Sequence, residues 1–399
     1  MISSSCVQKE SNGKDNDEMI HLDVKIITSP TTGISSEPYL FDSENEVLLS
    51  WIQKEDDSIF SLNYSKTTDT VWSKPEVIAE GSNWFINWAD YPVIAENKGN
   101  LISHYLQKSA KGKYTYDIKY QIKNKDSAWG SPRPLNEDYT QSEHGFVSIV
   151  PYGDNFFATW LDGRSMVDVP KDEMQMTLRA AIIDSSGIKK KDYLLDDRVC
   201  DCCQTTAAIT ENGPVVFYRD RSNEESEVRD ISIVRWQDTI WSEPKVVYKD
   251  NWKLKGCPVN GPRADALNNS LVVAWFSAAK FKPSVQLSFS SDNGENFDQP
   301  IRIDGGSPLG RVDIVLIDEK TAIVSWLETQ EDGEYILAMR VNSDGVRSTP
   351  VKVASASAER SSGFPQIAYR NKTLYLAWTS VLDKETSVVT AVMPVERFD

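Results

Sequence analysis

The feature of this sequence that most limits its fold is a unit that recurs seven times, a short apolar strand that ends in an aromatic residue and is followed by a polar loop. The gaps between successive aromatic residues are 54, 55, 58, 57, 51 and 52 residues. A period near fifty residues, filled with strands and turns, is typical of a β-propeller or a similar circular array. The aromatic residues are Trp51, Tyr105, Trp160, Tyr218, Trp275, Trp326 and Trp378.

Each unit reads as four short strands. The apolar run is the second of them, and the third alternates apolar and polar residues, as at 230–236 and 335–341, which is the pattern of a half-buried strand. The fourth begins with an aromatic residue and a proline, as at 241–244. A proline suits an outer edge strand, where its missing N–H is harmless. We therefore predict an all-β propeller of four-stranded blades, with seven blades favoured and six as the alternative if one unit is an embellishment.

The two ends of the chain complement each other. The seventh unit stops after its third strand, at 387–395, while residues 22–28 form a strand that belongs to no unit. We expect this N-terminal strand to close the ring as the missing outer strand, because closure removes an exposed sheet edge. Residues 22–399 are then a single propeller domain.

Residues 1–21 are small, polar and charged, which predicts a disordered tail. The Ser-rich stretch before Cys6 resembles the end of a bacterial lipoprotein signal, in which the cysteine becomes lipidated. This interpretation predicts an exported protein, in the periplasm or at the cell surface, that meets a membrane only through a lipid on Cys6. The alternative is an unstructured tail with an incidental cysteine.

The composition limits the class of partner. With 43 basic and 59 acidic residues the formal net charge is −16, which argues against nucleic acid and anionic membranes as partners, since both are bound through basic surfaces. No nucleotide-binding loop, zinc-protease motif or serine nucleophile elbow is visible. We expect a monomer that needs no cofactor.

One turn carries a family resemblance. The segment from Ser290 to Phe297 reads SSDNGENF and matches the Asp-box, S-x-D-x-G-x-x-[FW]. The chain therefore resembles the sialidase-like, Asp-box propeller superfamily, in which these boxes are structural and lie on the face away from the active site. The resemblance implies a glycan or another acidic small molecule as ligand. Sialidases also carry an Arg-Ile-Pro motif in the first blade, where this chain has Ser36-Glu37-Pro38. This departure makes true sialidase activity unexpected.

Propeller geometry places the loops that enter the first strand of each unit, and those that join the second and third strands, on one face around the channel. We call this face the channel mouth. The polar residues gathered there predict a glycan- or anion-binding pocket, with acids for acid–base chemistry and arginines for an anionic group. The alternative is that these side chains pair across blades and hold the ring together. The candidate acids are Asp162, Asp220 and Glu328, and the candidate arginines are Arg164, Arg219, Arg221 and Arg311.

Four cysteines precede the first strands of two neighbouring units: Cys200, Cys202 and Cys203 in one, and Cys257 in the next. In an oxidising compartment the favoured interpretation is a disulfide between Cys257 and one of the other three. A thiolate site for zinc or copper(I) and a set of free or redox-active thiols are the alternatives. Three functions thus remain open: a glycan-binding protein that is at most glycoside-active, a non-catalytic interaction module at the cell surface, and a cysteine-based metal or redox protein.

Overall fold

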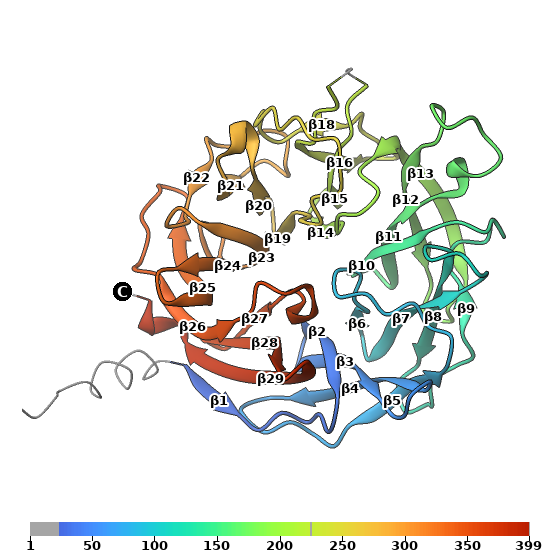
Figure 1. Cartoon of the computed structure of the whole chain (residues 1–399), viewed down its shortest axis with the longest axis horizontal. Helices are drawn as coiled ribbons and strands as arrows, with labels where there is room; N and C mark the ends of the chain where they lie inside the picture. The colour runs from blue at the N-terminus through green and yellow to red at the C-terminus, as the bar shows by residue number, and fades with distance from the viewer. Residues whose placement is uncertain (1–23, 224–225, 399) are drawn as a thin grey trace, which may run out of the picture.

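The computed structural model describes residues 24–223 and 226–398, so the tail with Cys6 lies outside the described residues. Within these ranges the chain forms seven antiparallel sheets arranged as blades around a central axis (Figure 1). The predicted all-β propeller with seven blades is confirmed. In five of the blades four strands follow the chain from the axis outward, the fourth blade has five strands, and the seventh takes its outermost strand from the N-terminal end of the described chain.

The bounds of the strands are as follows. The first three blades comprise β2 (Ser35–Asp42), β3 (Val47–Lys54), β4 (Phe60–Thr67) and β5 (Glu76–Gly81); β6 (Ile94–Asn97), β7 (Asn100–Lys108), β8 (Tyr116–Lys123) and β9 (Arg133–Pro134); and β10 (His144–Tyr152), β11 (Asn155–Asp162), β12 (Met176–Ile183) and β13 (Lys189–Val199). The next two comprise β14 (Thr206–Thr210), β15 (Gly213–Arg219), β16 (Ile231–Gln237), β17 (Ile240–Trp241) and β18 (Lys245–Val246); and β19 (Arg263–Leu267), β20 (Ser270–Ser277), β21 (Ser284–Ser290) and β22 (Ile301–Arg302). The last two comprise β23 (Pro308–Asp318), β24 (Thr321–Gln330), β25 (Gly333–Asn342) and β26 (Val351–Ala356); and β27 (Gln366–Arg370), β28 (Thr373–Leu382), β29 (Glu385–Pro394) and β1 (Lys25–Ile27).

The ring closes as the sequence predicts. Strand β1 pairs antiparallel with β29, so that Lys25 lies opposite Val392 and Ile27 opposite Thr390. Ile27 is buried, and the N-terminal strand thus completes the last blade on its outer side (Figure 1). The first and the last strands of the described chain are therefore joined in one sheet.

The repeated aromatic residues form the contacts between blades. Trp51, Trp160, Trp275 and Trp326 are among the largest fully buried side chains. Trp51 of the first blade packs with residues of the seventh, and Trp275 of the fifth packs with residues of the fourth. The fifty-residue period therefore marks the side chain with which each blade contacts the one before it.

The innermost strands of neighbouring blades do not pair, so their backbone N–H groups need other acceptors. At several blade boundaries a polar side chain of one innermost strand accepts the N–H group of the next. The bonds run from Ala207 N to Ser148 Oγ (3.0 Å), from Leu316 N to Asp265 Oδ2 (2.8 Å) and from Ile367 N to Asp313 Oδ2 (2.8 Å).

The Asp-box folds as a structural turn between β21 and β22. Ser290 Oγ accepts the N–H of Gly294 at 3.0 Å, and Asp292 Oδ1 accepts the N–H of Asn296 at 2.9 Å. Gly294 has φ +77°, a left-handed conformation that glycine adopts without strain. Phe297 packs edge-on against Phe217 of the preceding blade, so the aromatic residue of the motif contributes to the contact between two blades.

The helical segments of the described chain are four turns of three residues each, far too short to cross a membrane. They lie in loops or at the C-terminal end: η1 (Arg164–Met166), η2 (Ala279–Phe281), η3 (Arg360–Ser362) and η4 (Val395–Arg397).

Candidate functional site

Two of the candidate arginines lie side by side at the channel mouth. Arg219 Nη2 donates to the carbonyl oxygen of Asn260 at 2.7 Å, and the backbone N–H of Arg311 donates to Asn260 Oδ1, also at 2.7 Å. A single asparagine side chain and its backbone therefore join the two residues, which the sequence places on the same face.

The guanidinium groups of both arginines are occupied by the protein itself. Arg219 and Arg311 are buried, with exposed fractions of 1% and 6%. Their N–H groups fasten neighbouring loops, and binding of an anionic ligand by them stays a prediction. The acceptors are the carbonyl oxygens of Arg229, Asn260 and Phe276 for Arg219, and those of Ala358, Glu359 and Gly363 for Arg311.

Two of the candidate acids accept a buried indole N–H group. Trp160 Nε1 donates to Asp162 Oδ2 at 2.8 Å, and Trp326 Nε1 donates to Glu328 Oε2 at 2.7 Å. Both carboxylates are buried and both stand two residues after the repeated tryptophan. This recurring arrangement gives Asp162 and Glu328 a structural role, because a buried indole N–H needs an acceptor. Their part in catalysis stays a prediction.

The remaining two candidates, Asp220 and Arg221, directly follow β15 of the fourth blade. Asp220 Oδ2 accepts the hydroxyl of Ser232 at 3.2 Å, and burial raises the pKa of Asp220 to about 6. Arg221 forms an ion pair of 2.8 Å with Glu227. The candidate residues thus fall into separate groups, each with its own protein partners.

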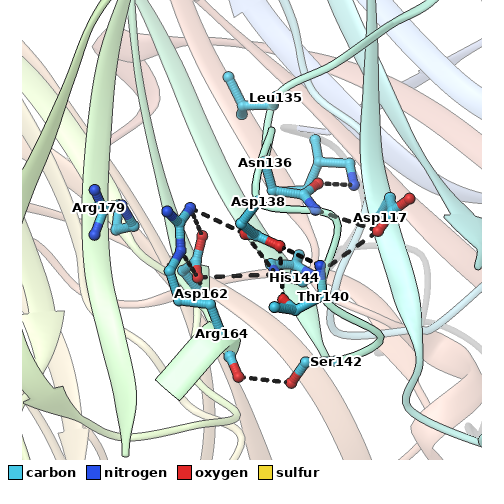
Figure 2. Close-up of polar contacts among 12 residues, drawn as sticks. Asp117, Leu135, Asn136, Asp138, Thr140, Ser142, His144, Asp162, Arg164 and Arg179 are labelled. Carbon is cyan, nitrogen blue, oxygen red and sulfur yellow. Dashed lines mark hydrogen bonds and ion pairs between the residues drawn. The ribbon is translucent and has the colours of Figure 1, made fainter. Parts of the chain in front are cut away.

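Asp162 and Arg164 belong to a network around His144 (Figure 2). Arg164 holds Asp162 by two bonds of 2.7 Å and reaches Asp138 Oδ2 at 3.0 Å. His144 Nε2 lies 3.2 Å from Asp138 Oδ2, and His144 Nδ1 lies 3.1 Å from the carbonyl oxygen of Tyr116. The carboxylate oxygens of Asp138 and Asp162 and a ring nitrogen of His144 are close enough together to hold a metal ion. However, the guanidinium of Arg164 already supplies a positive charge to these carboxylates.

The electrostatics of this network favour an ion-paired histidine. Burial alone would lower the pKa of His144, but its hydrogen bond to Asp138 and the charges of Asp162 and Asp138 outweigh burial and raise it. Burial likewise would raise the pKa of Asp138, yet bonds from His144 and Thr140 lower it. We interpret the network as a structural joint, because it ties the loop before β10 to the end of β11.

A second group at the channel mouth was not identified from the sequence. The hydroxyl of Tyr116 lies 2.9 Å from Glu143 Oε1 and 3.4 Å from Asp90 Oδ2. Asp90 precedes β6, Tyr116 begins β8 and Glu143 directly precedes β10, so two loops and the start of a strand meet there. In the sequence, two of these residues are acids that stand just before the first strands of two neighbouring units. The loops that contain arginine are more conspicuous in the sequence.

The two carboxyl groups that share the Tyr116 hydroxyl have raised pKa values. Burial raises the pKa of Asp90 to about 8 and that of Glu143 to about 7. Asp90 is buried and accepts the N–H of Phe146 at 2.7 Å, whereas Glu143 is only half-buried. Glu143 is therefore the member that a ligand can reach with a proton available near neutral pH.

Partly exposed aromatic side chains surround this group. Phe85 stacks on Tyr116 with ring centroids 4.0 Å apart and an interplanar angle of 10°. Trp88 stacks on Phe364 at 5.6 Å, and Tyr114 stands half exposed beside Phe85. The loop before β6 thus offers flat apolar faces next to polar acids, which is the usual chemistry of a small-molecule site.

The four thiols come together near the same face. Cys200 Sγ lies 3.9 Å from Cys202 Sγ and 3.6 Å from Cys203 Sγ. Cys257 Sγ, a carboxylate oxygen of Asp201 and Cys202 Sγ lie within 4.8 Å of one another. All four thiols are free in the structure, and the disulfide that the sequence favours stays a prediction.

Several buried groups take up protons on folding, which sets a direction for the pH dependence of stability. Each raised folded-state pKa gives stability that is present at low pH and is lost as the pH rises through the folded-state value. We expect the unfolding temperature to fall steadily from about pH 5 to about pH 8.5, with Asp90→Asn flattening the part near pH 8. A rise over this interval would contradict the assignment. The groups are Asp90, Glu143, Asp220, Asp265 and His144.

No family model matches the sequence, and no curated protein matches it. Similar solved structures are the polysaccharide lyase Uly1, with a TM-score of 0.55 and 9% identity over 97% of this chain and 94% of that one, and the Penicillium chrysogenum α-L-arabinanase complexed with arabinobiose, with a TM-score of 0.51 and 13% identity over 95% and 99%. The phage phi92 endosialidase is also similar, with a TM-score of 0.48 and 10% identity over 94% of this chain and 69% of that one. At these identities the likeness is one of fold alone. The comparisons thus show a seven-bladed propeller fold, and the resemblance of the Asp-box to that of sialidase-like propellers stays a prediction.

Proposed function

We propose that this propeller binds a glycan at the channel mouth, above Asp90, Tyr116 and Glu143, and that Glu143 is the general acid if the glycan is cleaved. The observation that carries the proposal is the Tyr116 hydroxyl shared by two carboxyl groups whose pKa values burial raises to about 8 and about 7. A carboxyl group that is protonated near neutral pH can donate to a sugar hydroxyl or to a leaving glycosidic oxygen.

The surroundings favour a neutral glycan over an acidic one. Glu37 stands where sialidases have the isoleucine of Arg-Ile-Pro, and it is buried, with a pKa that burial and the charge of Asp90 raise. The two buried arginines donate to backbone carbonyls instead of facing a ligand carboxylate. Carboxyl groups that hold their protons can donate to the hydroxyls of a neutral sugar, but they offer no positive charge to the carboxylate of an acidic one. Phe85 and Trp88 supply aromatic faces on which sugar rings can stack.

The chemistry also differs from that of a tyrosine nucleophile. Tyr116 is fully buried, and burial followed by the charges of Asp90 and Glu143 raises its pKa well above the usual value. Such a hydroxyl is a poor nucleophile at neutral pH, so we assign it the role of bridging the two acids. Two of the similar structures are of a polysaccharide lyase and of an arabinanase complexed with arabinobiose, which supports glycans as the ligand class. Export, as the Cys6 interpretation predicts, would bring the site to extracellular polysaccharide.

Glu143→Gln is the test variant. The wild-type protein is screened on an array of neutral and acidic oligosaccharides and then on aryl-glycosides. We expect binding of a neutral glycan, and Glu143→Gln should reduce turnover by about 10²- to 10⁴-fold with a smaller change in KM. Glu44→Gln, in the exposed turn between β2 and β3, is the matched control and should behave as wild type.

The outcomes separate the remaining functions. Binding without turnover, weakened by Phe85→Ala, would identify the non-catalytic glycan-binding module that the sequence leaves open. Binding of acidic glycans alone, or binding unchanged in both Glu143→Gln and Phe85→Ala, would place the ligand elsewhere and contradict the proposal.

A further inference from the structure

We propose that Cys200, Cys202, Cys203 and Cys257 bind one thiophilic d¹⁰ metal ion, Zn²⁺ or Cu(I). The site is separate in its chemistry from the glycan proposal and does not depend on it. Both ions favour thiolate ligands, and the experiment below distinguishes them.

The spacing of the sulfur atoms suits a shared ion. Cys200 Sγ is 3.6 Å from Cys203 Sγ and 3.9 Å from Cys202 Sγ, and the three sulfur atoms lie within 4.8 Å of one another. Thiolates at about 2.3 Å from a tetrahedral Zn²⁺ are about 3.8 Å apart. Three sulfur atoms thus surround one point, an arrangement that a pairing into two disulfides does not require.

The loops give the site both a rigid base and an entrance. Cys200 and Cys203 are buried in the turn before β14, whose start is fixed by the bond from the Cys200 N–H to the carbonyl oxygen of Arg219 at 3.1 Å. Cys257 comes from the loop before β19 in the next blade and is exposed. An ion can therefore enter from the solvent side past Cys257 and be held by the buried thiols.

A buried arginine independently indicates a negative charge in this place. The side chain of Arg229 is only 4% exposed, and within the described residues its Nε and Nη1 atoms have no hydrogen-bond partner. Its Nη2 pairs with Glu227 at 2.9 Å, while Nη1 is 4.0 Å from Asp201 of the thiol loop. A buried guanidinium with free N–H groups is costly unless an anion faces it. A metal ion with three or four thiolates carries a net negative charge and supplies that anion.

Arg229 would then act from outside the coordination shell. Groups that hydrogen-bond to metal ligands orient them and tune the ion, and their loss costs roughly 10- to 100-fold in metal affinity. Asp201, beside Cys202 and Cys257, offers an oxygen ligand if one thiolate is absent. With Arg229 beside the thiols, a metal ion is favoured over the disulfide that the cysteine spacing alone favours.

The experiment uses the full chain, reduced and freed of metal under anaerobic conditions. Zn²⁺ is titrated against a chromophoric chelator, Cu(I) against bathocuproine disulfonate, and Co²⁺ serves as an optical probe of tetrahedral thiolate coordination. We expect one ion per chain with thiolate-to-metal charge-transfer absorption, and the tighter of the two competitions identifies the ion. Cys203→Ser should bind at least about 100-fold more weakly, and Arg229→Leu roughly 10- to 100-fold more weakly.

Two further variants keep the test decisive if the buried substitutions unfold the protein. Cys257→Ser changes an exposed residue and should weaken binding while the thermal unfolding of the metal-free protein stays the same. Cys6→Ser removes the fifth cysteine, in the tail, and should leave affinity and stoichiometry unchanged. Equal affinity in wild type, Cys203→Ser and Cys257→Ser would overturn the proposal. Disulfides found among the four cysteines by non-reducing peptide mapping of exported protein would also overturn it, in favour of the covalent pairing.

Discussion

Removal of residues 1–27 is expected to open the ring and to destabilise the whole propeller by about 3 to 6 kcal/mol, since β1 and the residue before it bury two aliphatic side chains at about 1.5 to 3 kcal/mol each. The two side chains are Val24 and Ile27, which pack against the last and first blades. The carbonyl oxygen of Ile27 also accepts the hydroxyl of Thr390, which in turn accepts the indole N–H of Trp72 in the first blade. Thermal unfolding of the truncated protein measures the loss.

Removal of residues 1–21 alone is the matched control. This deletion spares β1 and should leave the unfolding temperature unchanged. The longer deletion also exposes the outer edge of β29, and an unpaired edge strand promotes association between copies. We therefore expect concentration-dependent aggregation of the longer deletion only. Equal unfolding temperatures for the two truncated proteins would show that β1 does not hold the ring closed.

The closure illustrates what the sequence can predict about this fold. A period of about fifty residues, an unassigned strand at 22–28 and a last unit without its outer strand are properties of local pattern, and each has one arrangement that satisfies the sheet edges. The Asp-box is equally local, because the acceptor groups of Ser290 and Asp292 and the left-handed Gly294 all lie within one turn.

The partners of the polar side chains could not be predicted in the same way. Arg311 donates to carbonyl oxygens of a loop about fifty residues further on, and nothing in the composition of that loop marks it as an acceptor. Asp90 and Glu143 come from two separate loops and Tyr116 from the start of β8, so their shared hydrogen bonds exist only once the second and third blades have packed. The sequence could predict that the polar loops share a face, but not which donors the backbone would occupy.

The cysteines are an intermediate case. Their positions before the first strands of neighbouring units predicted that they would approach one another, and the structure brings them together. The spacing could not reveal Arg229, which reaches the thiol loop from the segment before β16. That buried charge, rather than the cysteine pattern, favours a metal ion over a disulfide.

Asp313→Ala is expected to destabilise the protein by about 3 to 5 kcal/mol, because it leaves a largely buried arginine without its partner. Asp313 Oδ1 accepts Arg263 Nε at 2.8 Å, and Asp313 Oδ2 accepts the N–H of Ile367 at 2.8 Å. One carboxylate thus connects the fifth, sixth and seventh blades beside the channel, where a cavity of about 440 Å³ lies. Urea unfolding followed by tryptophan fluorescence measures the loss.

The double variant Arg263→Met with Asp313→Asn distinguishes the effect of the unpaired arginine charge from that of the hydrogen bond between Asp313 and Ile367. Asparagine keeps an oxygen for the N–H of Ile367, and methionine fills the arginine volume without a charge that needs a partner. Replacing both members of a buried pair costs less than removing one, so this variant should be more stable than Asp313→Ala. If both variants lose the same stability, neither the unpaired charge nor the lost acceptor for the Ile367 N–H is the cause, since the double variant removes the charge and keeps an acceptor. The same hydrogen bond between innermost strands recurs from the N–H of Leu316 to Asp265, which forms no ion pair with an arginine within the described part of the chain. Asp265→Ala should therefore cost less than Asp313→Ala, and that difference measures the contribution of the buried charge pair.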